Sequence, residues 1–580
     1  MSSPFLLHPH GQPGGHRPAS RGASARADED LLLVVLAGLA ALALGAGLLV
    51  WSAGQIAGRL TSGAWPRVDP TDALGILVAL PRHLSDPAAA WPAATRNDLP
   101  GPLPIYAVLA LELFLAVGAI AAVWHRVVLW QAGARQRTRD RSFRWARRTH
   151  IRHLLVDSPE RGRLLLGRIG RRLVAAEPRA STLIVAPTQA GKTTRLVVPN
   201  VLGWRGPLVV TSVKADVLAA TLERRRDRGH VQVFDPTGAT GYDTARWSPL
   251  LTCTTYEAAE RTAAWLVQAA GDPDNPHARY WEQLGARLLG PMLFAAAGTA
   301  GSMSDIARWV DRRDETEVTD ILEALADQDA LDAWSATTAR EERAKDSVYG
   351  TAEVLLRAFT SPSVRQATTV EDDSDRIDVE RLLDGDNTLY LVAPEHEQHR
   401  LRPLFEALVQ SVVRAAQDRY ARTGEPLDPP LLLMLDEAAN IAPLRNLDTL
   451  AATGAGQGIL LCTVWQDLAQ LDAIYNRRAA TVINGHRAKV LLAGQADLGT
   501  LDQLSRHIGD DELVRPAPTW STDGRRSVSE HASDVRLAPV EYLRQLPIGQ
   551  AIVLYGNLPP LRLGLLPYNH DPSYALTHSA

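Results

Sequence analysis

Residues Val185 to Thr194 read Val-Ala-Pro-Thr-Gln-Ala-Gly-Lys-Thr-Thr, and they continue directly from the short apolar run Thr182–Val185. A Gly-Lys-Thr that follows a strand and opens a helix is typical of the phosphate-binding loop of P-loop nucleotidases. In that loop, backbone N–H groups surround the phosphates, the lysine contacts the β- and γ-phosphate oxygens, and the threonine hydroxyl holds Mg²⁺. The stretch therefore predicts a site for ATP and Mg²⁺.

The loop predicted to bind the nucleotide consists of Ala186, Pro187, Thr188, Gln189, Ala190, Gly191, Lys192, Thr193 and Thr194. Lys192 is its predicted catalytic cation and Thr193 a predicted Mg²⁺ ligand. Ala186 replaces the first glycine of the usual pattern, and alanine is compatible with a tight turn if its φ angle is negative. Only four of the 61 lysines and arginines are lysines. A lysine at this position therefore indicates a chemical requirement, and the alternative is a chance Gly-Lys-Thr at the start of a surface helix.

A second apolar strand, Leu431–Leu435, leads into Asp436 and Glu437. Because ligands of open α/β sheets bind beyond the carboxyl ends of the strands, Asp436 is predicted to hold Mg²⁺. Glu437 is predicted to orient and deprotonate the attacking water. The next strand, Ile459–Val464, is followed two residues later by Gln466. This glutamine is predicted to sense the γ-phosphate, with capping or a surface hydrogen bond as the alternative.

The rest of the chain predicts an α/β fold with a helical insertion. Residues 161–253 and 369–570 alternate apolar runs with helical stretches, which indicates a parallel sheet covered on both faces. Residues 254–368 contain no convincing strand and predict an inserted all-α domain, in which Trp281, Leu284, Leu288 and Leu289 have the helical spacing of core residues. Segment 516–537 is expected to be a mobile loop. The expected strands are Leu183–Val185, Leu208–Thr211, Val231–Phe234, Thr388–Val392, Leu431–Leu435, Ile459–Val464, Val490–Ala493 and Ala551–Tyr555.

Two stretches near the start of the chain, residues 31–54 and 103–124, are apolar enough to be transmembrane helices. At ~1.5 Å per residue, each can cross a hydrocarbon core of ~30 Å. Glu112 interrupts the second stretch, which predicts either a partner in the membrane or a protonated glutamate that faces its own helix pair.

The arginine-rich segment 125–160 assigns the orientation, because positive charge flanks membrane spans on the cytoplasmic side. The expected order is a disordered cytoplasmic tail over 1–30, an extracytoplasmic loop over 55–102, and a basic juxtamembrane segment over 125–160. The protein is thus expected to be a multi-pass protein of the plasma (inner) membrane, with its ATPase domain in the cytoplasm.

Composition excludes some classes of protein. The chain of 580 residues is too long for one core, and its net charge of −4 gives no global basic field for nucleic acid. Its two cysteines, Cys253 and Cys462, argue against a disulfide framework and fit a reducing compartment.

With these residues placed, the chain resembles the type IV secretion coupling proteins, the TraG/TraD family of conjugative DNA-transfer ATPases. The resemblance runs from the two apolar spans almost to the end of the chain and rests on the order and spacing of its motifs. These are the P-loop, Phe234–Gly238 with Arg246–Leu250, Tyr280–Glu282, Asp436-Glu437, Gln466 with Leu468–Tyr475, Asn484-Gly485 and Leu554–Pro560.

The resemblance implies a RecA-like motor domain that bears an all-α domain and assembles as a membrane-anchored homo-hexamer. Such a ring is expected to receive a relaxase bound to single-stranded DNA and to deliver it, with ATP hydrolysis, to the channel proteins of a type IV secretion system. By the same resemblance, Lys192 and Thr193 bind phosphates and Mg²⁺, Asp436 and Glu437 form the Walker B pair, and Gln466 is the sensor. The helical unit is expected to carry the substrate contacts.

The chain departs from the family pattern at two places. One is Ala186, and the other is segment 453–458, which lacks the arginine that many relatives carry before the sensor strand. That arginine is expected to act on the neighbouring subunit's γ-phosphate, a contribution of about 10³ or more in rate where such fingers are used. Arg445 or Arg487 could substitute, and slow or partner-dependent hydrolysis is expected.

Two other functions fit the same sequence. One is a double-stranded DNA translocase of the FtsK type, although no winged-helix module is seen after residue 560 and the helical insertion is more like that of a coupling protein. The other is a membrane receptor or scaffold that binds nucleotide without productive hydrolysis and docks secreted proteins through its helical domain.

Overall fold

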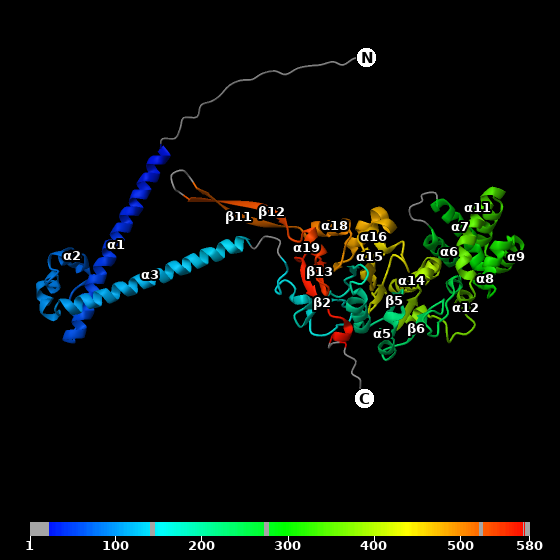
Figure 1. Ribbon diagram of the computed structural model, residues 1–580, viewed down its shortest axis with the longest axis horizontal. Helices are drawn as coiled ribbons and strands as arrows, with labels where there is room; N and C mark the ends of the chain where they lie inside the picture. The colour runs from blue at the N-terminus through cyan, green and yellow to red at the C-terminus, as the bar shows by residue number, and fades with distance from the viewer. Residues whose placement is uncertain (1–21, 140–144, 272–277, 521–525, 572–573, 575–580) are drawn as a thin grey trace, which may run out of the picture. The chain divides into compact units, whose positions relative to one another are not determined.

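The computed structural model describes residues 22–139, 145–271, 278–520, 526–571 and 574 (Figure 1). The chain divides into two compact units, residues 1–141 and residues 142–580.

The first unit is built on two long helices, α1 (Gly22–Ser62) and α3 (Pro102–Arg139), with the short helix α2 (Ala73–Ala79) between them. Residues Leu36–Ser62 and Pro102–Arg126 of these helices are long and apolar enough to cross a membrane. Because α1 begins at residue 22, residues 22–30 are helical where a disordered tail was expected, and residues 1–21 lie outside the described residues. Helix α3 likewise continues into the basic juxtamembrane segment.

The two long helices contact each other through a polar pair. Ser52 Oγ donates a hydrogen bond of 2.9 Å to Glu112 Oε2, so Glu112 faces its own helix pair, which is one of the two alternatives for this residue. Close to Ser52, α1 also packs tightly against Trp91 of the segment between the two long helices. A Cβ on Gly54 would lie 2.4 Å from the Trp91 ring.

The second unit contains a twelve-stranded sheet whose middle is parallel. Each expected strand overlaps an observed one, which confirms the α/β prediction, but β13 pairs antiparallel with β10 and the strands beyond it were not predicted. Across the sheet the order is β1 (Leu155–Val156), β3 (Arg172–Ala175), β2 (Leu165–Ile169), β14 (Leu561–Gly564), β13 (Gln550–Tyr555), β10 (Ala488–Leu492), β4 (Thr182–Val185), β9 (Ile459–Trp465), β8 (Leu431–Leu435), β5 (Leu208–Ser212), β7 (Thr388–Val392) and β6 (Val231–Phe234).

Alternate residues of each central strand belong to two different cores. In β4, Leu183 and Val185 join one buried cluster, whereas Ile184 joins the other. Because side chains alternate along a strand, this partition confirms that helices and loops cover both faces of the sheet. The covering helices are α4 (Val198–Gly203), α5 (Ala215–Arg226), α13 (Val379–Leu382), α14 (Gln398–Thr423), α15 (Leu447–Gln457), α16 (Leu468–Tyr475), α17 (Ala479–Gly485), α18 (Leu498–Ile508) and α19 (Val540–Arg544).

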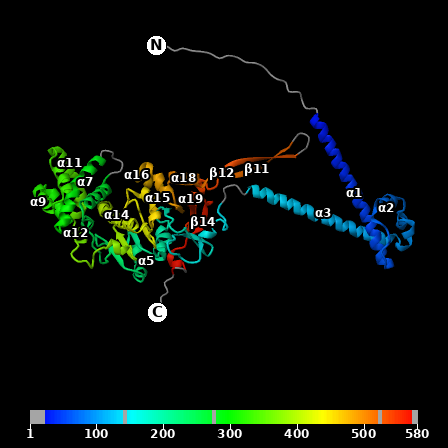
Figure 2. The same cartoon turned by 180° about the vertical axis from the view of Figure 1, so that it is seen from behind.

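Helices fill the chain between β6 and β7. Figures 1 and 2 show α7, α8, α9 and α11 gathered at one end of this unit, away from β13 and β14. Leu284, Leu288 and Leu289 are buried in α7 as expected, and Trp281 packs against the same cluster. Before the short α13, which precedes β7, these helices are α6 (Tyr256–Ala270), α7 (Ala278–Gly298), α8 (Met303–Arg312), α9 (Glu315–Leu325), α10 (Gln328–Thr338), α11 (Glu342–Leu356) and α12 (Pro362–Thr368).

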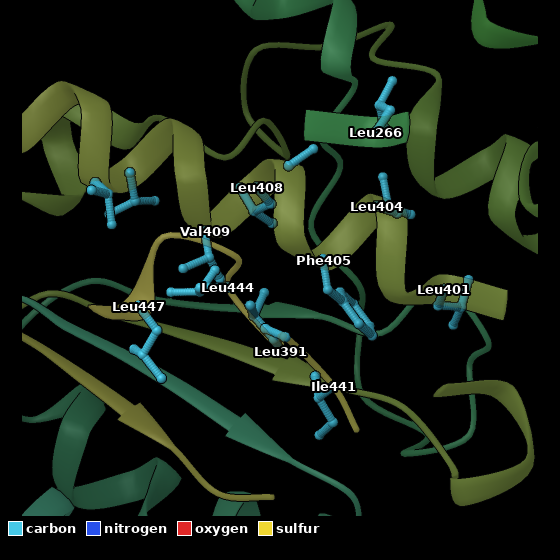
Figure 3. Packing of buried hydrophobic residues seen from close by; sticks show 14 of the residues in the cluster. Leu266, Leu391, Leu401, Leu404, Phe405, Leu408, Val409, Ile441, Leu444 and Leu447 are labelled. Atoms are coloured by element: carbon cyan, nitrogen blue, oxygen red, sulfur yellow. The ribbon is translucent and has the colours of Figure 1, made fainter. Parts of the chain in front are cut away.

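Helix α14 joins the helical part to the sheet. Its residues Leu404, Phe405 and Leu408 are fully buried and lie between Leu266 of α6 and Leu391 of β7 (Figure 3). One continuous apolar core therefore runs from the helical part to one face of the sheet.

Segment 516–537 is different from the expected loop. It belongs mostly to a two-stranded antiparallel hairpin of β11 (Asp510–Trp520) and β12 (Arg526–Arg536), with Asp510 paired to Arg536 and Trp520 to Arg526. The loop prediction was wrong for residues 516–520 and 526–536, because these residues lack an apolar alternation and Pro516 and Pro518 argue against a strand. Residues 521–525 of the predicted loop lie outside the described residues. Backbone pairing holds the two strands together.

Helix α14 also carries a buried acid, Glu406. Its Oε1 accepts a hydrogen bond of 3.3 Å from the Arg445 backbone N–H, but its Oε2 has no hydrogen-bond partner among the described residues. Burial raises the pKa of Glu406 to about 7, although Arg445 and Arg402 oppose the shift. The side chain lines a cavity of about 1610 Å³ whose walls come from α6, α7, α14, α15, α16 and the residues beside them.

Replacement of Glu406 by glutamine should flatten the dependence of stability on pH. The folded chain binds a proton at Glu406 that the unfolded chain has released above its ordinary pKa of 4.5. The stabilisation that this proton contributes is complete below pH 4.5, where it is on the order of 3 kcal/mol. It is lost as pH rises through about 7. In thermal melts of the full chain, the midpoint temperature of Glu406→Gln minus that of wild type should increase from about pH 5 to about pH 8. Glu353→Gln, at an exposed glutamate of α11, is the control, and parallel curves for all three proteins would contradict this assignment.

Candidate nucleotide site

The predicted phosphate-binding loop leaves the sheet at the carboxyl end of β4. Its first residue, Ala186, is fully buried, and its backbone N–H donates a 2.8 Å hydrogen bond to the Trp465 carbonyl of β9. The left-handed positions of the loop are Gln189, with φ 64°, and Gly191, with φ 80°. Ala186 is not among them, so alanine occupies the place of the usual glycine without backbone strain.

Gly191 is favoured by its backbone conformation, and a side chain here would also displace the end of Arg195. A Cβ at this position would lie 1.7 Å from Arg195 Nη1, and the positive φ disfavours any side chain. The helix begins at Lys192, passes through a π-helical stretch over Thr193–Val197, and continues as α4. The loop thus wraps directly onto a helix N-terminus, where backbone N–H groups are free to bind an anion.

The structure brings Lys192 together with both predicted carboxylates. Lys192 Nζ lies 3.2 Å from Glu437 Oε1 and 3.8 Å from Asp436 Oδ1. The lysine is 9% exposed and Asp436 is 5% exposed, so the cluster is largely removed from water. Three charges from two distant segments therefore meet at one edge of the sheet.

Asp436 is an under-satisfied buried acid. Its Oδ1 has no hydrogen-bond partner among the described residues, although Thr211 Oγ1 donates 3.0 Å to its backbone carbonyl. Burial raises the pKa of Asp436 to about 6, Lys192 lowers it, and the charges of Glu437 and Asp216 raise it further. A buried carboxylate oxygen of this kind needs a cation or a donor, so the residues fit a Mg²⁺ ion.

Glu437 is held in a strained backbone conformation with φ 55°. Asn440 Nδ2 donates 3.3 Å to Glu437 Oε2, while Lys192 contacts the other oxygen. Both oxygens are therefore oriented by side chains. Sequence reasoning missed Asn440, Thr211 and Asp216, because single polar residues outside a motif carry no positional signal.

Gln466 lies at the same edge, one residue beyond β9. Strand β9 lies between β4 and β8, and Val185 pairs with Trp465, so Gln466 and Ala186 leave the sheet side by side. The backbone of Gln466 is fixed, since its N–H donates 3.0 Å to Gln470 Oε1 and its carbonyl accepts 2.8 Å from Gln495 Nε2. Its sensor role stays a prediction.

The two arginines considered as substitutes have partners within the chain. Arg445 Nη2 lies 3.4 Å from Glu282 Oε1, and Arg487 Nε lies 2.9 Å from Glu177 Oε2. Arg487 also directly precedes β10, so it lies at the amino ends of the parallel strands, whereas the phosphate-binding loop lies at their carboxyl ends. An action of either residue on a neighbouring subunit stays a prediction.

Comparison with known proteins points to one family. The family model described as "Type IV secretory system Conjugative DNA transfer" matches residues 148–579. The conjugal transfer protein TraG of Escherichia coli is 28% identical over 375 residues, which cover 60% of this chain and 57% of that protein. Protein VirD4 of Agrobacterium fabrum is 25% identical over 418 residues, which cover 67% of this chain and 59% of that protein. The chain thus spans under two thirds of these curated relatives.

Solved structures share the fold. The plasmid coupling protein TrwB in complex with the ATP analogue ADPNP has a TM-score of 0.55 and 20% sequence identity, with 75% of this chain and 96% of that chain covered. TrwB in complex with ADP and Mg²⁺ has a TM-score of 0.53 at the same identity, with 74% and 94% covered. This likeness confirms the RecA-like fold. Since the family model covers most of the chain, the protein belongs to the type IV secretory system conjugative DNA-transfer family.

Proposed function

We propose that this protein is an ATPase that couples ATP hydrolysis to the transfer of relaxase-bound single-stranded DNA into a type IV secretion channel. The observation that carries the proposal is the cluster of Lys192, Asp436 and Glu437 at the phosphate-binding loop. TraG and TrwB, to which the chain is similar, are named as a conjugal transfer protein and a plasmid coupling protein, and TrwB binds ADP with Mg²⁺.

The residues of the site divide the chemistry among them. Backbone N–H groups of the loop and the Lys192 amine would bind the phosphates, and Thr193 with Asp436 would hold Mg²⁺. When bound, the metal ion would neutralise charge on the phosphate oxygens. Glu437, oriented by Asn440, would accept a proton from the attacking water, and Gln466 would respond to the loss of the γ-phosphate.

The anchor and the assembly belong to the same proposal. Large apolar side chains are exposed along both long helices, among them Leu42, Leu103 and Phe114 at 71%, 80% and 75%. Such surfaces suit a lipid environment, so we place α1 and α3 in the inner membrane as two spans, with the ATPase domain in the cytoplasm. A homo-hexamer would allow neighbouring subunits to complete each site, and the helical part would contact the cargo.

Replacement of Lys192 by alanine should abolish DNA transfer in mating assays and lower ATP turnover by about a hundredfold or more, because the phosphates lose their buried cation. Lys345→Ala, at an ion-paired lysine of α11, is the control and should retain both activities. Transfer by the Lys192→Ala protein would instead support a scaffold that needs no hydrolysis. Stimulation of the wild-type ATPase by double-stranded rather than single-stranded DNA would support a double-stranded DNA translocase.

Replacement of Gly191 by alanine should weaken binding of a fluorescent ATP analogue by about tenfold or more, because the positive φ disfavours alanine within the phosphate-binding loop and the Arg195 side chain must move aside. Gly385→Ala is the matched control, since Gly385 has φ 75° and open space around its Cβ position. Both variants carry the backbone penalty, but only Gly191→Ala disturbs the loop. Equal affinities for the two variants would contradict the assignment of the loop.

Replacement of Glu437 by glutamine should separate binding from hydrolysis. The amide cannot accept the proton from water, so turnover should fall about a hundredfold, while the nucleotide is still bound through the loop and Lys192. Single-turnover hydrolysis and equilibrium binding, measured on the same preparation, distinguish these effects. A loss of binding that matches the loss of turnover would show that Glu437 acts only by holding Lys192.

A further inference from the structure

A second cavity, of about 420 Å³, lies against the face of the sheet formed by β4, β10 and β13. Its walls are mostly apolar and come from the sheet, α16, α17 and α18, and the segment after β13 closes it with Pro559 and Pro560. The apolar side chains include Leu183, Leu468, Ile483, Leu504, Ile508 and Leu554. Nothing in the nucleotide chemistry described above uses this space.

One cation lies in this apolar surrounding. Lys489 is the second residue of β10, and it pairs with Leu183 on one side and Leu554 on the other. It lines the cavity and is only partly exposed. Within the described parts of the chain, its amine has no hydrogen bond and no ion pair, whereas Lys192 and Lys345 both pair with carboxylates.

An unpaired ammonium group in an apolar wall is costly and calls for an anion. Burial lowers the pKa of Lys489, and no carboxylate offsets this effect. The titratable groups around it are His507 of α18, Tyr555 of β13 and His486, which precedes β10 and whose pKa is lowered by burial to about 4. None of these groups supplies a negative charge near neutral pH.

We propose that this cavity binds a small carboxylate with an apolar body, whose carboxylate pairs with Lys489 and whose body fills the space between the sheet, α17 and α18. The volume is in the range of small-molecule pockets, which combine apolar walls with a few polar groups. Asn484 and Asn557, both exposed at the lining, offer amide donors for the second carboxylate oxygen. The ligand would thus contact the strand that ends in the phosphate-binding loop, without touching Lys192.

The binding test uses the full chain in a non-ionic detergent, with phenylpropionate, its neutral amide and phenylpropylamine as probes. Saturation-transfer NMR titrations should show wild type binding the carboxylate about tenfold or more tighter than the amide, with the amine weakest. Lys489→Met keeps an unbranched apolar stem and should reduce the preference for the carboxylate to about twofold or less. Lys345→Met is the matched control and should keep the preference. Equal binding of the three probes, or no binding of phenylpropionate to wild type, would overturn the proposal.

A second measurement needs no substitution. Acetylation of the wild-type chain by an amine-reactive ester can be followed lysine by lysine, because the sequence contains only four. Burial lowers the pKa of Lys489, so its amine should become reactive at a lower pH than an ordinary lysine amine. Phenylpropionate should slow acetylation at Lys489 about tenfold at a concentration ten times its Kd, and it should leave Lys214 unchanged. If protection is absent while Lys489 reacts freely, the lysine merely extends along the wall to water and the proposal fails.

Discussion

The parallel pairing of β4, β9 and β8 holds the nucleotide site together. Lys192 and Glu437 are 245 residues apart in the chain, yet their side chains form a 3.2 Å contact. Val185 pairs with Trp465, and Leu435 pairs with Thr463, so the segments that follow these strands leave the sheet at one edge. A shift of register by one residue would turn each strand's side chains to the opposite face. The position of the cluster is therefore tied to the packing of both faces of the sheet.

The same sheet links the site to the helical part of the chain. The core on one face continues from Leu391 of β7 through Phe405 of α14 to Leu266 of α6 (Figure 3). Side chains packed at the density of a protein interior transmit displacements to their neighbours. A movement of the helices that enter this core is therefore expected to displace side chains of the sheet, and Asp436 and Glu437 directly follow β8 of that sheet. This continuity gives a motor of the proposed kind a physical route between hydrolysis and cargo.

Backbone strain and an unpaired buried oxygen occur together where the chemistry is proposed. Gln189 and Glu437 adopt positive φ angles that favour glycine, and Asp436 keeps a buried oxygen without a hydrogen bond. Arg225, by contrast, is fully buried and fully engaged, since it donates to Thr388 and to the carbonyls of Trp204, Gly206 and Asp386. Lys489 is half-buried, has no hydrogen bond or ion pair among the described residues, and lines a cavity. Each of the two proposed ligand sites thus contains one charged group without a hydrogen bond in the part of the chain that the structure describes, Asp436 Oδ1 in one and the Lys489 amine in the other.

The sequence alone determined the phosphate-binding loop, the acidic pair after Leu435, the central strands and the two apolar helices, because each is a local pattern of residue type and spacing. It could not reveal the antiparallel strands at one side of the sheet or the β11–β12 hairpin, which depend on pairing between segments with little apolar signal. Asn440 and Lys489 gained meaning only from their neighbours in space. Tertiary structure decided which carboxylates meet Lys192 and that Ala186 is unstrained, because sheet register and backbone φ angles result from packing of the whole chain and not from any single motif.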